Sequence, residues 1–118
     1  MTNQQVVDRF KELALQEKWF DIQDELFSDN VKSIEPSGSP YFRDVEGKAA
    51  VRRKADDFVK RIETVHRVHT SEILVTGNHI AVARDMDLTV NGHGRIQIDE
   101  IMLYELKDGR IVSEQFFY

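Results

Sequence analysis

The N-terminal part of the chain repeats its apolar residues with the period of an α-helix, from residue 2 to residue 27. A polar segment, Gln16-Glu17-Lys18, divides the pattern, so two short helices or one bent helix are predicted. Thr2 and Gln5 have the spacing of a capping box, and Ser28-Asp29-Asn30 is expected to end the second helix. The first apolar stripe consists of Val6, Val7, Phe10, Leu13 and Ala14, and the second of Trp19, Ile22, Leu26 and Phe27.

A short strand, a loop and a third helix follow. Residues 31–35 favour a strand that ends at Pro36, because proline lacks an amide hydrogen and restricts the preceding residue to extended backbone. Residues 36–40 are predicted to be loop, and Gly47 opens a helix with apolar residues on one face. That face consists of Val51, Ala55, Phe58 and Ile62. A solvated face is predicted for the charged residues Arg52, Arg53, Lys54, Asp56, Asp57 and Lys60.

From Thr64 onward the apolar period changes to two, which is typical of strands. The turn signals Gly77-Asn78, Asn91-Gly92 and Asp108-Gly109 divide this region into four strands of an antiparallel meander. Strands of about 9 to 13 residues are long relative to the helices, so the sheet is expected to twist and curl around them. The predicted helices precede the predicted sheet, which is typical of an α+β protein. Residues 1–118 are predicted to form a single domain.

Hydrophobicity predicts which face of the two central strands points inward. Even-numbered positions are mostly apolar in residues 80–90 and again in residues 96–106, so the even positions should face the helices. A three-residue loop, 91–93, keeps these faces together and places Arg84 opposite Glu100. We prefer this loop to a two-residue turn, which would place Arg84 opposite Asp99.

The last hairpin is interpreted as a three-residue loop, Lys107-Asp108-Gly109. This register places Met102 opposite Glu114 and Glu100 opposite Phe116. The even positions of the final strand would then face inward. A one-residue error in the loop, or a β-bulge, would reverse the assignment.

Three charged residues, Arg84, Glu100 and Glu114, fall on this inward face. Charges among apolar side chains need partners, so an ion pair between Arg84 and Glu100 is expected. A buried carboxyl left without a partner would have a raised pKa, which suits proton transfer. The alternative is that these residues lie at the wet mouth of the sheet or on its outer surface, as most charged residues do.

Composition narrows the function classes. With 41% hydrophobic and 31% charged residues in 118, the chain can bury one core and is expected to be a soluble globular protein. A net charge of −5 disfavours nucleic acid as a partner. The absence of cysteine excludes disulfides, thiolate metal sites and a cysteine nucleophile, and a cytoplasmic location is expected. No apolar run approaches the ~20 residues of a membrane span, so no membrane association is expected.

Four short segments carry a family resemblance: residues 26–31 (LFSDNV), 34–36 (IEP), 46–51 (EGKAAV) and 108–112 (DGRIV). With the order of elements, they make nearly the whole chain similar to the SnoaL-like branch of the NTF2-like superfamily. The resemblance implies an NTF2-like (cystatin-like) cone, in which three N-terminal helices pack on a strongly curved antiparallel β-sheet. The same cone supports ketosteroid isomerases, polyketide cyclases, epoxide hydrolases, dehydratases and transport factors, so it does not by itself define the activity.

The resemblance also implies a proton-transfer residue. In ketosteroid isomerase-like members, a carboxylate just before the proline after the first strand shuttles a proton, and Glu35 matches that place. The family's oxyanion-donating tyrosine matches Phe10, which has no hydrogen to donate. Its protonated aspartate matches Met102 or, with a shifted gap, Glu100. Steroid isomerisation of the usual kind would therefore need Glu100 or Tyr118 as the donor.

Other chemistries match less well. Epoxide hydrolase-like members need arginine and aspartate two residues apart on one strand face, but Met86 follows Arg84 at that spacing. His66 and His69 are three residues apart in a predicted strand and should face opposite sides, so the histidines form no ligand motif. No metal and no cofactor are expected.

Apolar residues at odd positions predict a contact surface on the opposite face of the sheet. In a monomer, Ile101, Leu103, Ile111 and Phe117 would face water. The resemblance implies sheet-to-sheet homodimers, so a homodimer through this outer face is expected. The alternative is that a helix or a chain terminus covers the patch.

Three functions remain open. The first is an acid/base isomerase or cyclase acting on a small apolar carbonyl compound, in which Glu35 removes a carbon-bound proton and Glu100, Arg84 or Tyr118 stabilises the oxyanion. The second is a protein that binds a small hydrophobic molecule without chemistry. The third is an interaction domain whose cavity is filled by its own side chains. The predicted ligand pocket comprises Phe10, Trp19, Met86, Met102, Glu114, Phe116 and Tyr118.

Overall fold

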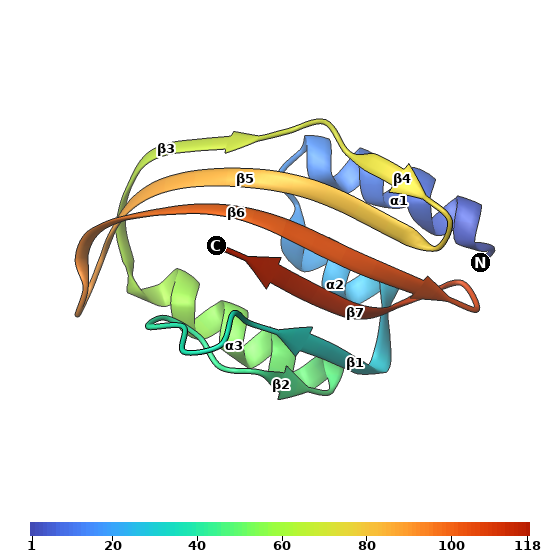
Figure 1. Cartoon of the computed structure of the whole chain (residues 1–118), viewed down its shortest axis with the longest axis horizontal. Helices are drawn as coiled ribbons and strands as arrows, with labels where there is room; N and C mark the ends of the chain where they lie inside the picture. Colours follow the sequence, from blue (N-terminus) through green and yellow to red (C-terminus); the bar gives the residue numbers. More distant parts are fainter.

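Three helices and seven strands make up the chain in a computed structural model that describes residues 1–118 (Figure 1). β5 and β6 are the longest strands and run along the molecule, with α1 and α2 near one end of the sheet (Figure 1). The helices precede most of the sheet, which confirms the α+β class. The elements are α1 (Asn3–Leu15), α2 (Trp19–Leu26), β1 (Phe27–Ile34), β2 (Val45–Glu46), α3 (Lys48–Arg61), β3 (Ile62–Thr70), β4 (Leu74–Thr76), β5 (His79–Val90), β6 (Gly94–Lys107) and β7 (Arg110–Phe117).

The helical prediction for the N-terminal residues is confirmed, including its break. Thr2 caps α1 through a capping box with Gln5, and all five residues of the first apolar stripe are buried. α2 ends at Leu26, one residue before the predicted end, but the strand starts earlier than predicted, because Ser28–Asn30 lie in β1. A register shift between Phe27 and Lys32, in the pairing of β1 with β7, accommodates these polar residues within the strand.

The strands form one mixed sheet in the order β2-β1-β7-β6-β5-β3, and β4 also pairs with β5. All pairs are antiparallel except β1 and β7, which are parallel, so the expectation of a wholly antiparallel sheet needs this correction. The sheet curls around the helices but does not close (Figure 1). The first strand of the predicted meander is divided into β3 and β4, because Ser71 exchanges hydrogen bonds with Ala83 of β5 through its side chain and amide.

The β5–β6 register is confirmed: residues 91–93 form the loop and Arg84 lies opposite Glu100. The predicted β6–β7 register is wrong by two positions: one arises because the turn contains only Asp108 and Gly109, both with positive φ, and the other from a bulge beside Glu105 and Leu106. Met102 therefore pairs with Phe116. The shorter turn alone would turn the even positions of β7 outward. The bulge beside Glu105 and Leu106 shifts the pairing by one more residue, so the even positions beyond it still face inward.

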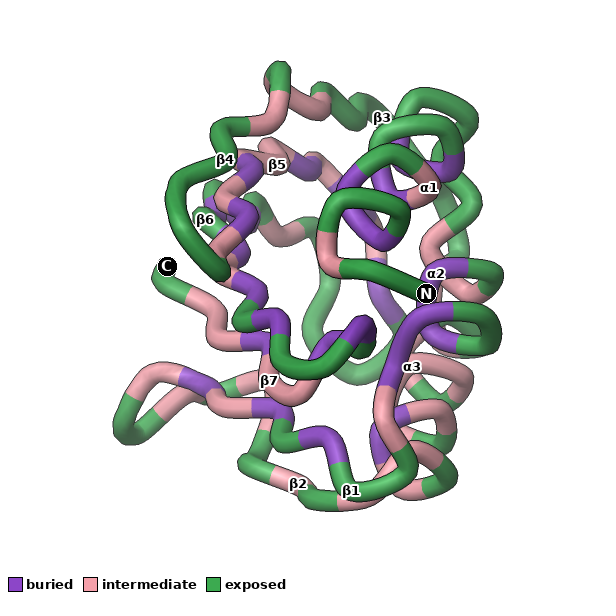
Figure 2. The backbone as a smooth tube through the Cα atoms, turned by 90° about the vertical axis from the view of Figure 1, so that its right-hand side faces the viewer, coloured by how far each residue is buried: buried purple, intermediate pink, exposed green.

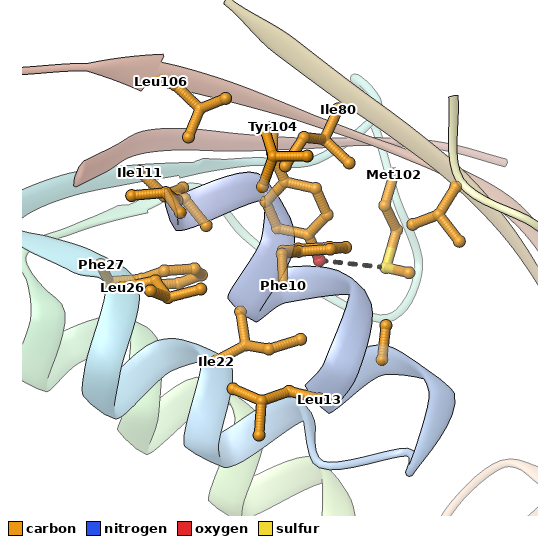
Figure 3. Packing of buried hydrophobic residues seen from close by; sticks show 14 of the residues in the cluster. Phe10, Leu13, Ile22, Leu26, Phe27, Ile80, Met102, Tyr104, Leu106 and Ile111 are labelled. Carbon is orange, nitrogen blue, oxygen red and sulfur yellow. Dashed lines mark hydrogen bonds between the residues drawn. The ribbon is translucent and has the colours of Figure 1, made fainter. Parts of the chain in front are cut away.

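Two groups of buried side chains form the core, and Figure 3 shows residues of the larger group. The larger joins α1 and α2 to β5, β6 and β7, and the smaller, around Met86 and Leu88, lies farther along the sheet. β3 carries mostly exposed residues (Figure 2). Ile111 belongs to the larger group and is fully buried, so its predicted place on the outer face is wrong (Figure 3). The bulge is the reason, because it lets Ile111 point inward although its number is odd.

Candidate functional site

A cavity of about 420 Å³ opens between the helices and the curved sheet. Its walls are mostly apolar and come from both core groups, so the hypothesis of a cavity filled by the protein's own side chains is wrong. Of the predicted site residues, those that line the cavity are Trp19, Glu35, Arg84, Met86, Glu100, Met102, Glu114 and Phe116.

Phe10 and Tyr118 do not line this cavity, so their predicted place in the pocket wall is wrong. Phe10 is completely buried in the core beside Tyr104 (Figure 3). Its ring is edge-on to those of Tyr104 and Trp19. It lies behind the wall because the α1 stripe packs directly onto the sheet. Tyr118 is 36% exposed at the end of β7 and reaches the site only through its hydroxyl, which contacts Glu35.

Glu35 is fixed just beyond β1, where Pro36 ends the strand. Its backbone amide donates to Asp44 Oδ1 at 2.7 Å, and its carboxylate is buried. Lys54 Nζ of α3 donates to Oε2 at 2.8 Å, and the Tyr118 hydroxyl donates to Oε1 at 2.8 Å. Both oxygens of Glu35 are therefore held by donors from other elements.

Lys54 is a site residue that the sequence interpretation assigned to a solvated face, and the structure contradicts this. Besides its ion pair with Glu35, its ammonium donates to Ser33 Oγ at 2.6 Å and lies 5.5 Å from the centre of the Phe116 ring. The helical spacing could have predicted this direction, because Lys54 is three residues after Val51, on the apolar side of α3.

Ser33 is a second residue that the sequence analysis missed. It is completely buried on β1 and donates to Glu114 Oε1 at 2.7 Å, while its oxygen accepts from Lys54. Burial raises the pKa of Glu114 to about 7, although the hydrogen bond from Ser33 and the charge of Lys54 oppose the change. Glu35, Lys54, Ser33 and Glu114 thus form one chain of hydrogen bonds along the cavity wall.

Arg84 forms a different ion pair from the one predicted. Its Nη2 donates to Glu17 Oε2 at 3.1 Å, and its guanidinium lies 4.8 Å from the centre of the Trp19 ring, so the predicted pair with Glu100 is wrong. Its Nε is buried without a partner.

Glu17 attracts Arg84 because it lies at the left-handed turn between α1 and α2, with a φ of +56°. Its carboxylate also accepts hydrogen bonds from Thr70 and from the indole of Trp19. Burial alone would raise the pKa of Glu17, but these bonds and the charge of Arg84 outweigh burial and lower it. Glu17 therefore joins the helix turn to β3 and β5.

Glu100 lines the cavity without any hydrogen-bond partner in the protein, although the residue is only 7% exposed. Burial raises its pKa to about 7; Arg84 opposes this change, and Glu35 and Glu114 add to it. The alternative of an outer-surface location for Glu100 and Glu114 is wrong, because both are buried. A carboxyl that titrates near neutrality can both accept and donate a proton.

A second hollow, of about 400 Å³, lies between the end of α1 and the segment from Val68 to Ile73. Glu17 and Val68 line both this hollow and the main cavity. These two residues are therefore shared by the walls of the two spaces.

A family model described as SnoaL-like domain matches residues 1–118. The chain belongs to the SnoaL-like domain family. The cone expected of this SnoaL-like protein is thus observed, with a mixed and open sheet. No curated protein matches the chain. No helix is both long enough and apolar enough to span a membrane.

Solved structures resemble this SnoaL-like domain over its full length. A candidate SnoaL-like polyketide cyclase from Mesorhizobium loti is 29% identical, with a TM-score of 0.88 and complete coverage of both chains. A candidate SnoaL-like polyketide cyclase from Jannaschia sp. CCS1 is 18% identical, with a TM-score of 0.71 over 98% of this chain and 83% of the other. An NTF2-like protein of unknown function from Burkholderia pseudomallei is 19% identical, with a TM-score of 0.73 over 100% and 92%.

Proposed function

We propose that this SnoaL-like domain is a proton-transfer enzyme, an isomerase or cyclase, acting on a small and largely apolar carbonyl compound. The observation that carries the proposal is the carboxyl of Glu100, which lines an apolar cavity, has no hydrogen-bond partner and has a pKa raised to about 7 by burial. A base with a pKa near the working pH is available in both protonation states.

Glu100, rather than Glu35, is assigned the proton transfer. Both oxygens of Glu35 already accept hydrogen bonds from Lys54 and Tyr118, whereas those of Glu100 accept none. Glu35 is therefore a positioning residue that holds the Lys54 ammonium against the cavity wall. The role that the family resemblance implied for Glu35 moves to the neighbouring carboxyl in this proposal.

The proposed reaction begins with Glu100 as a carboxylate. It takes a proton from the carbon next to the substrate carbonyl, the C–H bond breaks, and its electron pair moves to form an enolate. Arg84 lies opposite Glu100 and uses only Nη2 in the protein, so its remaining Nη1 donors stabilise the enolate oxygen. Protonated Glu100 then returns the proton to another carbon, or the enolate carbon attacks a second carbonyl.

The test is proton exchange at carbon. Bicyclic ketones, 2-tetralone among them, are incubated with the protein in D₂O, and loss of the α-proton signal is followed by NMR. Exchange should be faster than in buffer, rise with pH through about 7 and fall at least about 100-fold in Glu100→Gln. Glu105→Gln, an exposed change on the same strand, should exchange normally. Equal rates in Glu100→Gln and the unchanged protein would overturn the proposal.

A binding protein without chemistry is the second candidate. The apolar walls and the volume of about 420 Å³ favour it as much as they favour an enzyme. It predicts that a ketone occupies the cavity, as seen by shifts of the Met86 and Met102 methyl signals, while its α-proton exchanges no faster than in buffer.

A further inference from the structure

The cations of the cavity are already paired. Arg84 contacts Glu17 at 3.1 Å and Lys54 contacts Glu35 at 2.8 Å. Each pair joins one positive and one negative charge, so the two pairs together add no net charge to the cavity lining. The ammonium of Lys54 has further acceptors in Ser33 and in the Arg43 carbonyl.

Two carboxyls remain without an ion-pair partner. Glu100 and Glu114 are 7% and 5% exposed, and both line the cavity. Two exposed lining residues, Lys18 and Asp21, carry opposite charges and cancel. With every group ionised, the lining would therefore have two negative charges in excess, in a space where unpaired charge is unfavourable.

Glu100 is the carboxyl that a ligand can reach. Glu114 accepts a hydrogen bond from Ser33, whereas Glu100 accepts none and lines the same cavity. The charged groups that act on Glu100 are Arg84 on β5, Glu35 beyond β1 and Glu114 on β7. The lone cation among them, Arg84, is bonded to Glu17.

We propose that the cavity binds compounds that carry a protonated amine, with the ammonium beside the carboxylate of Glu100. An ammonium supplies both the missing positive charge and the missing hydrogen-bond donors. The rings of Phe42 and Phe58, which meet edge to face at 4.8 Å in the cavity wall, offer additional contact for a cation or an apolar body. Anionic compounds are rejected, because they would add to the excess of negative charge.

This inference goes beyond the proposed function, because it concerns the charge of the ligand whether or not a proton moves to carbon. An ammonium beside Glu100 lowers the pKa of this carboxyl and keeps it ionised. Binding is therefore linked to proton release from Glu100. The affinity for an amine should rise as the pH increases through about 7, as long as the amine itself stays protonated.

Three probes of similar size test the proposal: 2-naphthylmethylamine, 2-naphthylmethanol and 2-naphthoate. Binding is measured by titration calorimetry near pH 6 and pH 8, in two buffers of different ionisation enthalpy, so that proton release is read directly. At the higher pH the amine should bind about 10-fold more tightly than the alcohol, as expected for one charge-assisted contact. The carboxylate should bind most weakly.

Two variants test whether the charge of Glu100, rather than the shape of the cavity, determines the preference for the amine. Glu100→Gln should bring the amine and the alcohol within about two-fold of each other and abolish proton release, while leaving the alcohol affinity unchanged. Glu105→Gln removes the same charge from the exposed side of β6 and should retain the preference. Equal binding of amine and alcohol in the unchanged protein, or a preference that survives in Glu100→Gln, would overturn this inference alone. Failure of all three probes to bind would count against the cavity as a ligand site, and so against the proposed function as well.

Discussion

Arg84 and Glu100 lie directly opposite each other on β5 and β6, yet the guanidinium donates to Glu17 and leaves Glu100 without a partner. Opposed charges on adjacent strands ordinarily pair. Here the carboxylate of Glu17 competes for the guanidinium from the helix turn, and the Trp19 ring supports it from one face. The result is a buried carboxyl that is free to interact with a ligand.

The buried carboxyls predict how stability depends on pH. Glu100 and Glu114 have pKa values raised from 4.5 to about 7, so the folded state binds their protons more tightly than the unfolded state does. The free energy of unfolding should fall as the pH rises from about 4.5 to about 7, by on the order of 3 kcal/mol per carboxyl, and should level off above that range. Urea unfolding at several pH values measures this. Glu100→Gln and Glu114→Gln should each flatten part of the slope, and an unchanged slope in both would contradict the assignment.

Lys54 is predicted to stabilise the cavity wall. Replacing it with methionine leaves the buried Glu35 carboxylate without its cation, which should cost about 3–5 kcal/mol in the free energy of unfolding near pH 8. The pKa of Glu114 should rise further, because the charge of Lys54 now opposes its rise. Chemical unfolding and carboxyl NMR titration measure the two effects. Lys60→Met, on an exposed part of the same helix, is the control and should change neither.

Glu17 is predicted to hold the only tryptophan of the chain in place. Glu17→Ala removes the acceptor of Trp19, Thr70 and Arg84, so the Trp19 emission should move to longer wavelength as water reaches the ring. Stability should fall by about 0.5–1.5 kcal/mol, the usual net contribution of a hydrogen bond, because the three donors are only half-buried. Glu12→Ala at an exposed site on α1 should leave the spectrum unchanged. An unshifted spectrum in Glu17→Ala would show that Trp19 needs no support from this turn.

The outer face of the sheet is proposed to form a homodimer. Ile101 and Phe117 pair across β6 and β7 and are 52% and 47% exposed, so they place two adjacent apolar side chains on the outer face. Ile101→Glu should convert a dimer into a monomer in native mass spectrometry and light scattering. Leu74→Glu, on the separate β4 edge, should leave the mass unchanged. A monomeric mass for the unchanged protein would refute this proposal.

The sequence predicts most of the inner sheet face but little of the hydrogen bonding in the cavity. Alternation in β5 and β6 is regular, so hydrophobicity alone places Arg84 opposite Glu100. The inward direction of Ile111 depends on a bulge that no alternation pattern reveals. Arg84 finds Glu17, 67 residues away in the chain, through a left-handed turn whose direction follows from tertiary packing.

Lys54 shows a second reason why the sequence does not predict the contacts of the cavity. A long cationic side chain can reach inward from a helix face that also meets solvent, so its charge does not predict its direction. Ser33 and Glu35 are recognised as partners of Lys54 only when β1 and α3 are seen side by side. The hydrogen-bond chain of the cavity is thus a property of packing between elements rather than of any local pattern.

Glu17 lines both the main cavity and the hollow beside α1. A different side chain at residue 17 would therefore alter the walls of two spaces at once, together with the contacts of Arg84 and Trp19. One residue in the helix turn thus links the shape of the cavity to the electrostatic surroundings of Glu100.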